Sequence, residues 1–236
     1  MSLLSSFKKR STLDAAIKQV AQARKSTESG RAEQLYLGAY QGFSSVIADN
    51  LLFSEALYQW GFALLHQAQT QVTEQAIETY EDAISKFSFC LLTAPNYLGA
   101  AIDGGVAFME LARISPEQGR ASLYGFAKDF FEKANGIQKG SAAYNLACIY
   151  ALRGEEELCL EALENAKQFG SLPEIANILA DEDMSAFKQA DWFINFIEEL
   201  QKKPEPEVAD KEKPVEYSVE PNFKIKKTED FDYYSK

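Results

Sequence analysis

The chain has 236 residues, 46% of them apolar, which is enough to bury a sizeable core in one domain that carries an appendage. Its formal net charge of -11 at pH 7 argues against non-specific binding to DNA or RNA, whose phosphates require a basic surface. Residues 32–200 hold 24 of the 35 acidic residues but only 9 of the 24 basic ones, so we expect a basic or neutral partner and no nucleic acid.

The first residues contain a short apolar stretch followed by Lys8, Lys9 and Arg10. They lack the hydrophobic region of a secretory signal, and no segment of the sequence approaches the length of a membrane span. We therefore expect a flexible basic N-terminus over residues 1–11, no integral membrane association and a cytoplasmic location. In an alternative interpretation, Leu3, Leu4 and Phe7 touch an anionic membrane beside the three basic residues.

Helical periodicity dominates the remaining sequence, and strand alternation is almost absent. A first helix is indicated around residues 13–21 and a second around 35–47. The pattern then predicts helices over residues 53–69, 74–92, 98–113, 117–135, 141–153 and 155–168, followed by a short helix after residue 174 and a last one over 184–201.

Capping signals set several of these boundaries. Ser115 and Pro116 are typical of an N-cap and a first helical turn, with Gln118 completing a capping box. Ser171 repeats this pattern two residues before Pro173. Gly154 fits a C-terminal cap, because glycine readily adopts the left-handed conformation that ends many helices.

The C-terminal part changes character after Gln201. The last helix is rich in apolar residues, which favours a helix that caps the end of an array. Residues 203–236 hold four of the seven prolines among alternating lysines and glutamates, so we predict a disordered tail. The expected domains are therefore 1–11, 12–201 and 202–236. Three aromatic residues near the end of the tail could form a docking motif, or the tail could stay unengaged: Phe231, Tyr233 and Tyr234.

A small residue followed by a small-large-small ladder recurs three times. The copies are Gly61 with Ala76, Tyr80 and Ala83; Gly105 with Ala127, Phe131 and Ala134; and Ala147 with Cys159, Leu163 and Ala166. Facing small residues let two paired helices approach closely, while the large residue fills the gap beside them. The ladder therefore predicts repeated helical hairpins.

Residues 143–155, with the ladder residues behind them, resemble a tetratricopeptide repeat (TPR). Two longer units precede this one, with Gly61 and Gly105 as their small residues, and a more degenerate unit containing Phe43 comes before them. The resemblance implies an all-α, right-handed superhelix of antiparallel helix pairs. The sequence departs from the family in lacking an aromatic residue four positions before each small residue, which leaves the number of true repeats open.

In that family the first helix of each pair lines a concave groove that binds a peptide or a partner protein. The resemblance therefore implies an apolar lining of Tyr58, Phe62, Leu65, Ile102, Val106, Met109, Tyr144, Cys148 and Ala151. Asn145 alone matches the polar residues with which some members clamp a C-terminal carboxylate, so we expect an extended or helical peptide with apolar side chains instead. Alternatively, the first helix or the C-terminal cap covers this lining.

Little in the sequence supports an enzyme. His66 is the only histidine, which excludes a His-pair metal site. The three cysteines lie in apolar helical runs and are interpreted as reduced core thiols: Cys90, Cys148 and Cys159. The acidic run from Asp181 to Asp183 fits helix capping better than acid-base chemistry. We expect no catalytic residue, cofactor or metal.

The sequence thus predicts a non-enzymatic scaffold or adaptor that binds a protein through its groove, as an assembly factor or a chaperone-like holder of a client. The alternative is a structural subunit of a larger complex that docks through its tail. An exposed apolar lining would also allow a homodimer through the concave face.

Overall fold

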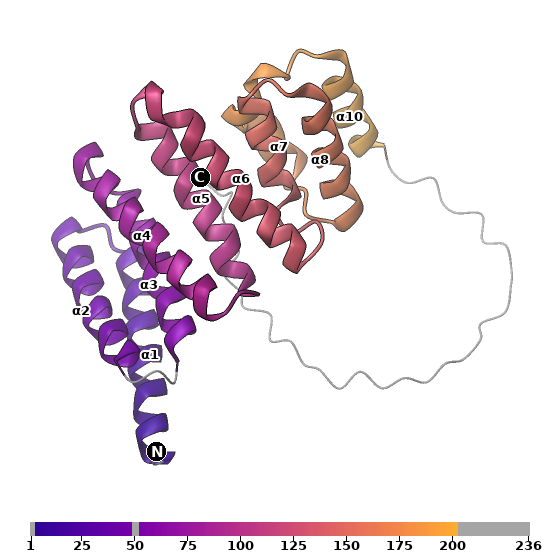
Figure 1. Ribbon diagram of the computed structural model, residues 1–236. Coiled ribbons are helices and arrows are strands. Elements are labelled where there is room, and N and C mark those ends of the chain that lie inside the picture. Colours follow the sequence, from indigo (N-terminus) through magenta and orange to yellow (C-terminus); the bar gives the residue numbers. More distant parts are fainter. Residues whose placement is uncertain (1–2, 49–51, 203–236) are drawn as a thin grey trace, which may run out of the picture. The chain divides into compact units, whose positions relative to one another are not determined.

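The computed structural model describes residues 3–48 and 52–202, and in these ranges the chain forms ten α-helices, one 3-10 helix and no strand. The contacts divide the chain into two compact units, Met1–Leu172 and Pro173–Lys236. Figure 1 shows the helices of the first unit as neighbouring antiparallel pairs. The all-α, paired-helix fold predicted from the sequence is therefore confirmed. The predicted domain boundaries stay predictions; α1 begins at Leu3, and residues 203–236 lie outside the described ranges.

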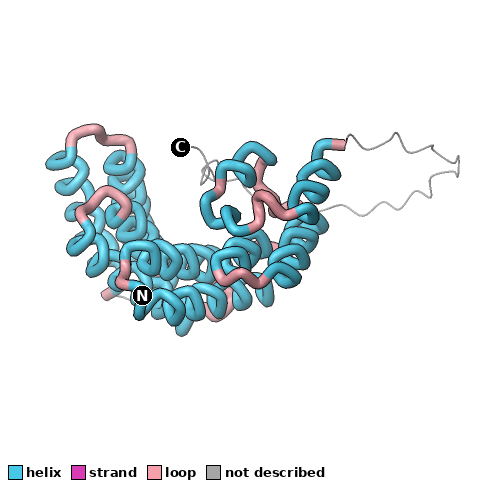
Figure 2. The backbone as a smooth tube through the Cα atoms, turned by 90° about the horizontal axis from the view of Figure 1, so that it is seen from above, coloured by secondary structure: helices cyan, strands magenta, loops and turns pink. Residues whose placement is uncertain are grey.

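The first unit contains four helical hairpins. In chain order they are α1 (Leu3–Arg24) with α2 (Ser29–Ile47), α3 (Phe53–Ala68) with α4 (Thr73–Thr93), α5 (Leu98–Ile114) with α6 (Glu117–Ile137), and α7 (Ala143–Leu152) with α8 (Glu156–Phe169). Each helix also contacts the next one along the chain, and Figure 2 shows the helices of this unit following one another in a continuous row. A continuous core results, because every hairpin covers the apolar side of its neighbour.

Glycines set the spacing within the second and third hairpins. A Cβ atom on Gly61 would lie 2.8 Å from the ring of Phe87, and one on Gly105 would lie 2.5 Å from the ring of Phe131. Both rings are fully buried, so the helices approach until an aromatic ring fills the space that a side chain would need. In the third hairpin the predicted large residue, Phe131, lies against the glycine. In the second hairpin the predicted register is wrong, since Phe87, two turns beyond Tyr80, lies against the glycine. At both glycines the nearest side chain is a ring and not the small residue that was expected.

The third ladder lies in the shorter fourth hairpin. Ala147 of α7 and the three ladder residues of α8 are all fully buried. Gly154 adopts a φ of +70° directly after the hairpin's first helix, as predicted, and Gly170 ends α8 with a φ of +69°. Left-handed backbone of this kind is accessible to glycine at little cost, which explains both sharp helix ends.

Two predicted N-caps are wrong. The hydroxyl of Ser115 donates to the carbonyl of Leu111 at 2.6 Å, so this residue closes α5, and α6 follows Pro116 without a side-chain cap. Likewise, α9 (Ile175–Ala180) is preceded by Glu174, which also makes no side-chain cap, and not by Ser171. A serine at a junction between two helices can satisfy the carbonyl behind it as well as the N–H groups ahead.

The second unit contains α9, the 3-10 helix η1 (Glu182–Ala186) and α10 (Asp191–Gln201). The single helix predicted over 184–201 is therefore wrong in its first part. Asp181 accepts a hydrogen bond from the backbone N–H of Asp183 at 3.0 Å, which confirms that the acidic run caps a helix. The indole of Trp192 packs edge-on against Phe187 and Phe193, with ring centroids 5.2 and 5.6 Å away.

The close approach at Gly105 gives a direct test of the fold. We expect Gly105→Ala to destabilise the protein by about 1–3 kcal/mol, because the added methyl group must displace the buried Phe131 ring. Gly125→Ala in α6 is the matched control, since a Cβ there meets nothing within 4 Å, and it should stabilise by about 0.5–1 kcal/mol through helix propensity. Thermal unfolding followed by circular dichroism measures both. Equal effects of the two changes would contradict the packing role of Gly105.

Candidate protein-binding surface

The first helices of the first three hairpins, α1, α3 and α5, are in contact through α3. Besides its partner α4, helix α3 contacts both α1 and α5. Three α3 side chains spaced four residues apart form one stripe toward these helices, because four residues make slightly more than one helical turn. We call Tyr58, Phe62 and His66 the α3 stripe.

Phe62 is the middle residue of the α3 stripe and is half-buried. The guanidinium carbon of Arg24, from α1, lies 5.3 Å from the centre of its ring, and the His66 ring packs edge-on against it with the two centroids 4.4 Å apart. A cation over an aromatic face contributes about 0.5–1 kcal/mol at an exposed site. The last residue of α1 therefore covers part of the Phe62 ring, which agrees with the alternative that the first helix covers the predicted lining.

Tyr58, at the other end of the stripe, connects α3 to α5. Its ring lies in an aromatic cluster with Tyr97, Phe87 and Phe62, at centroid distances of 4.9, 6.1 and 6.2 Å. Its hydroxyl donates to a carboxylate oxygen of Asp103 at 3.0 Å. Both ends of this side chain are thus fixed, which holds the stripe in place between two hairpins.

Asp103 is one of two buried charged or polar residues among those the structure describes. Burial raises the pKa of its carboxyl to about 7, and the hydrogen bond from Tyr58 lowers it by a smaller amount. Burial also raises the pKa of Tyr58, with the nearby Asp103 charge adding to the effect, so the tyrosine keeps its proton and acts as the donor. The carboxyl group is the part of this pair that titrates near neutral pH.

His66 is neutral at physiological pH. Burial, and to a smaller extent the charge of Arg24, lower its pKa to about 4, while a hydrogen-bond contact of 3.1 Å joins its Nδ1 to Oε1 of Gln69. All three cysteines are buried, as predicted, and burial raises the pKa of Cys90 to about 11 and that of Cys159 to about 12. Neither thiol is a ready nucleophile, because the thiolate is the reactive form.

The structure separates the predicted groove residues into two groups. Tyr58, Phe62, Ile102 and Asn145 are half-buried and keep some exposed surface, whereas Leu65, Val106, Met109, Tyr144, Cys148 and Ala151 are buried. Leu65 and Met109 follow Gly61 and Gly105 by four residues, so they lie on the sides of α3 and α5 that pack against the second helices. The predicted tail residues, Phe231, Tyr233 and Tyr234, lie outside the described residues.

Three residues of this surface were not predicted from the sequence: His66, Asp103 and Arg24. His66 could have been found, because it follows Phe62 by four residues on the same helix. Asp103 is an acid inside the otherwise apolar stretch 98–109, which is also a visible signal. Arg24 carries no such signal, since it lies 38 positions before Phe62 in the sequence and their contact depends on how the first hairpin packs.

The buried carboxyl predicts a pH dependence of stability. The folded-state pKa of Asp103 lies above its unfolded value of 3.8, so between these two pH values the folded protein holds a proton that the unfolded chain has released. The stabilising effect of this proton is lost as pH rises from about 4 to about 7. Asp103→Asn should remove this contribution, so its stability relative to the wild type should rise by up to about 1.4 kcal/mol per pH unit in that window and then level off.

Urea unfolding of both proteins at a series of pH values measures this difference. Asp129→Asn, at an exposed position of α6, is the control for losing one carboxylate from the surface. A stability difference between Asp103→Asn and the wild type that stays constant from pH 4 to pH 8 would contradict the assignment.

Comparison with known proteins shows which protein family the sequence matches. The family described as plant-specific mitochondrial import receptor subunit TOM20 matches residues 39–177. The mitochondrial import receptor subunit TOM20-1 of Arabidopsis thaliana is 33% identical over 99 residues, which are 42% of this chain and 50% of that protein. The chain therefore spans about half the length of this curated relative. No solved structure matches the chain.

Proposed function

Because the chain belongs to the plant-specific TOM20 family of mitochondrial import receptor subunits, we propose that it binds the targeting presequences of precursor proteins through the α3 stripe and the adjoining part of α5. The family match covers more than half of the chain, from α2 to α9. An import receptor is a non-enzymatic protein, in agreement with the prediction from the sequence.

Family membership corrects one expectation and refines another. The predicted cytoplasmic location is wrong, because the family is one of mitochondrial import receptor subunits. The predicted resemblance to TPR proteins agrees with the fold of paired antiparallel helices, while the family that matches the sequence is TOM20. Among the described residues, no helix is long and apolar enough to cross a membrane.

The observation that carries the proposal is a half-exposed aromatic stripe on an acidic domain. Presequences are amphipathic, rich in arginine and poor in acidic residues. Their apolar side would contact Tyr58, Phe62 and Ile102, which keep exposed surface on α3 and α5. Their basic side would be attracted by the excess of acidic residues in 32–200. An amphipathic helix lying on an apolar surface is a common mode of peptide recognition.

The electrostatics of the stripe fit a basic ligand as well. The neutral state of His66 keeps positive charge off the end of the stripe, as its pKa of about 4 requires. Arg24 is the cation that contacts the stripe, and it occupies the Phe62 ring in the way that a basic side chain of a ligand would. Arg24 therefore competes with the peptide. The proposal can thus be tested by one variant that should weaken peptide binding and by another that should strengthen it.

Phe62→Ala should weaken binding of a fluorescently labelled presequence peptide about tenfold, the effect of losing one central aromatic contact of 1–2 kcal/mol. Fluorescence anisotropy measures the affinity, and circular dichroism checks that helicity is kept. Phe126→Ala is the matched control, because Phe126 is a 52% exposed aromatic residue on α6, outside the stripe.

Two results would refute the role of the stripe. One is an equal loss of affinity in Phe62→Ala and Phe126→Ala. The other is binding that survives Phe62→Ala but disappears when residues 203–236 are deleted, since recognition would then belong to the tail.

Arg24→Ala should have the opposite effect and strengthen binding of the same peptide several-fold. It uncovers the Phe62 ring and removes a positive charge that repels a basic ligand. The gain should shrink at high salt, because screening weakens the repulsion. Arg120→Ala removes an exposed arginine from α6 as a control and should leave the affinity unchanged. A weaker peptide complex in Arg24→Ala would show that Arg24 supports the site instead of competing for it.

A further inference from the structure

One segment of the C-terminal region has the composition of a ligand for the α3 stripe. Between Glu220 and Glu229 the sequence contains no acid, and residues 223–227 read Phe-Lys-Ile-Lys-Lys. Apolar and basic side chains without acids are also the composition of a presequence. We call residues 223–227 the basic segment. It lies outside the described residues and outside the range 39–177 that matches the TOM20 family.

The spacing of the apolar side chains in the basic segment fits the spacing of the α3 stripe. In an extended peptide, side chains two residues apart lie on one side and about 6.5 Å from each other. Phe223 and Ile225 would then share one side, and the lysines that follow each of them would share the other. The half-buried rings of Tyr58 and Phe62 have centroids 6.2 Å apart. An extended basic segment would therefore place one apolar side chain beside each ring.

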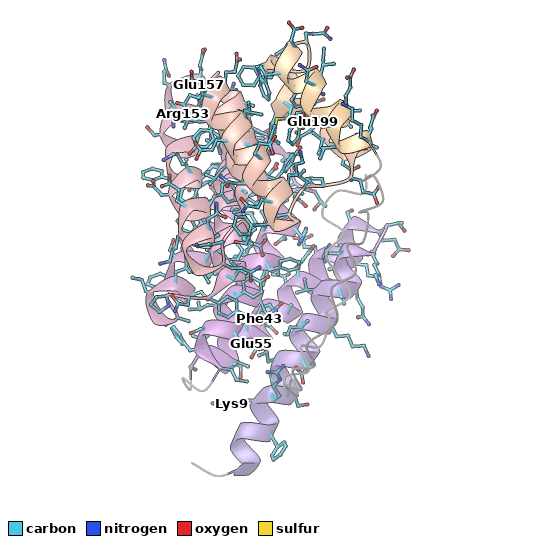
Figure 3. All side chains as sticks on the ribbon, turned by 90° about the vertical axis from the view of Figure 1, so that its right-hand side faces the viewer. Lys9, Phe43, Glu55, Arg153, Glu157 and Glu199 are labelled. Atoms are coloured by element: carbon cyan, nitrogen blue, oxygen red, sulfur yellow. The ribbon has the colours of Figure 1, made fainter. Side chains whose placement is uncertain are left out.

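The charges beside the stripe favour one orientation of a basic peptide. Asp103 of α5 accepts the hydrogen bond from Tyr58 at 3.0 Å, and Glu55 precedes Tyr58 by about one turn on α3 (Figure 3). Arg10, which pairs with Glu55 at 2.9 Å, and Arg24, which covers part of the stripe, both belong to α1. Like charges repel, so the lysines of a bound segment would lie toward α5 and away from α1.

The chain before the basic segment is long enough for the segment to reach a site on the first unit. The 20 residues from 203 to 222 can span up to about 70 Å. This is about twice the length of α1, the longest described helix, whose 22 residues extend over about 33 Å. A ligand linked to its site in this way has an effective concentration on the order of millimolar, so even a weak ligand occupies the site for much of the time.

We propose that the basic segment binds the α3 stripe of its own chain and is displaced by an incoming presequence. This inference rests on the proposed binding of presequences by the stripe and adds its regulation. A peptide must outcompete the linked segment, so the segment lowers the apparent affinity for every presequence. The aromatic stretch 231–234 fits the stripe less well, because Glu229, Asp230 and Asp232 would be repelled by the acidic residues of 32–200.

The first test measures the affinity of the full chain for a fluorescently labelled presequence peptide by anisotropy. Phe223→Ser/Ile225→Ser should strengthen binding several-fold, because the stripe is then open in a larger fraction of the molecules. Val215→Ser/Val219→Ser is the matched control, since it removes two apolar side chains from the same region outside the basic segment. The control should bind the peptide like the wild type.

The second test does not depend on presequences. A labelled peptide of residues 221–228 should bind the full chain with Phe223→Ser/Ile225→Ser more tightly than it binds the wild type, in which the linked segment competes. Adding Phe62→Ala to this variant should weaken the binding about tenfold. Adding Phe126→Ala instead should leave the binding unchanged, because Phe126 lies on α6 outside the stripe.

The outcomes distinguish this inference from the proposed function. If Phe62→Ala weakens presequence binding while Phe223→Ser/Ile225→Ser leaves it unchanged, the stripe binds presequences and the inference is wrong. If presequences do not bind but the 221–228 peptide binds through Phe62, the proposed function is wrong and the contact within the chain stands. The inference is also overturned if the 221–228 peptide does not bind, or if Phe62→Ala and Phe126→Ala weaken its binding equally.

Discussion

The close approach of paired helices at Gly61 and Gly105 is the constraint on which the first unit depends. At each position the absence of a side chain leaves room for a buried ring from the second helix of the hairpin, Phe87 or Phe131. The two glycine-ring pairs have the same separation of 26 residues in sequence, so the second and third hairpins share one packing register. A side chain at either glycine would push the helices apart and change the angle at which the next hairpin is added.

This spacing also positions the α3 stripe. Since α3 packs against α4 through the side that bears Gly61 and Leu65, the stripe lies on the adjacent side, where Tyr58 also contacts Phe87 of α4 and the helix contacts α1 and α5. The bond from Tyr58 to Asp103 then joins α3 to α5, and Arg24 closes over Phe62 from α1. The surface is apolar where side chains remain partly exposed, and its charged members, Arg24 and Asp103, come from neighbouring hairpins. This suits the proposed function, because apolar contacts tolerate variation in the sequence of a bound peptide whereas buried polar contacts do not.

Membership in a mitochondrial import receptor family gives the acidic charge of the chain a function in the proposed mechanism. Presequences carry positive charge, and an acidic domain raises their local concentration before any contact forms.

The sequence by itself determined the helical hairpins, the ring of Phe131 beside Gly105 and the buried cysteines. Helical periodicity and the size of side chains act over a few turns, so these features can be read locally. It misplaced Ser115 as an N-cap, because the carbonyl of Leu111 competes for the same hydroxyl. Counting from a glycine also does not show burial, and two of the residues predicted to line the groove, Leu65 and Met109, are buried.

Only the tertiary structure decided which lining residues stay exposed and which charges stand beside them. The contact of Arg24 with Phe62 and the bond of Tyr58 to Asp103 join residues 38 and 45 positions apart, and both depend on the angle between successive hairpins. The lowered pKa of His66 and the raised pKa of Asp103 follow from burial, which the packing of several helices creates. Local sequence specifies each helix, whereas the surface between hairpins exists only after they have packed.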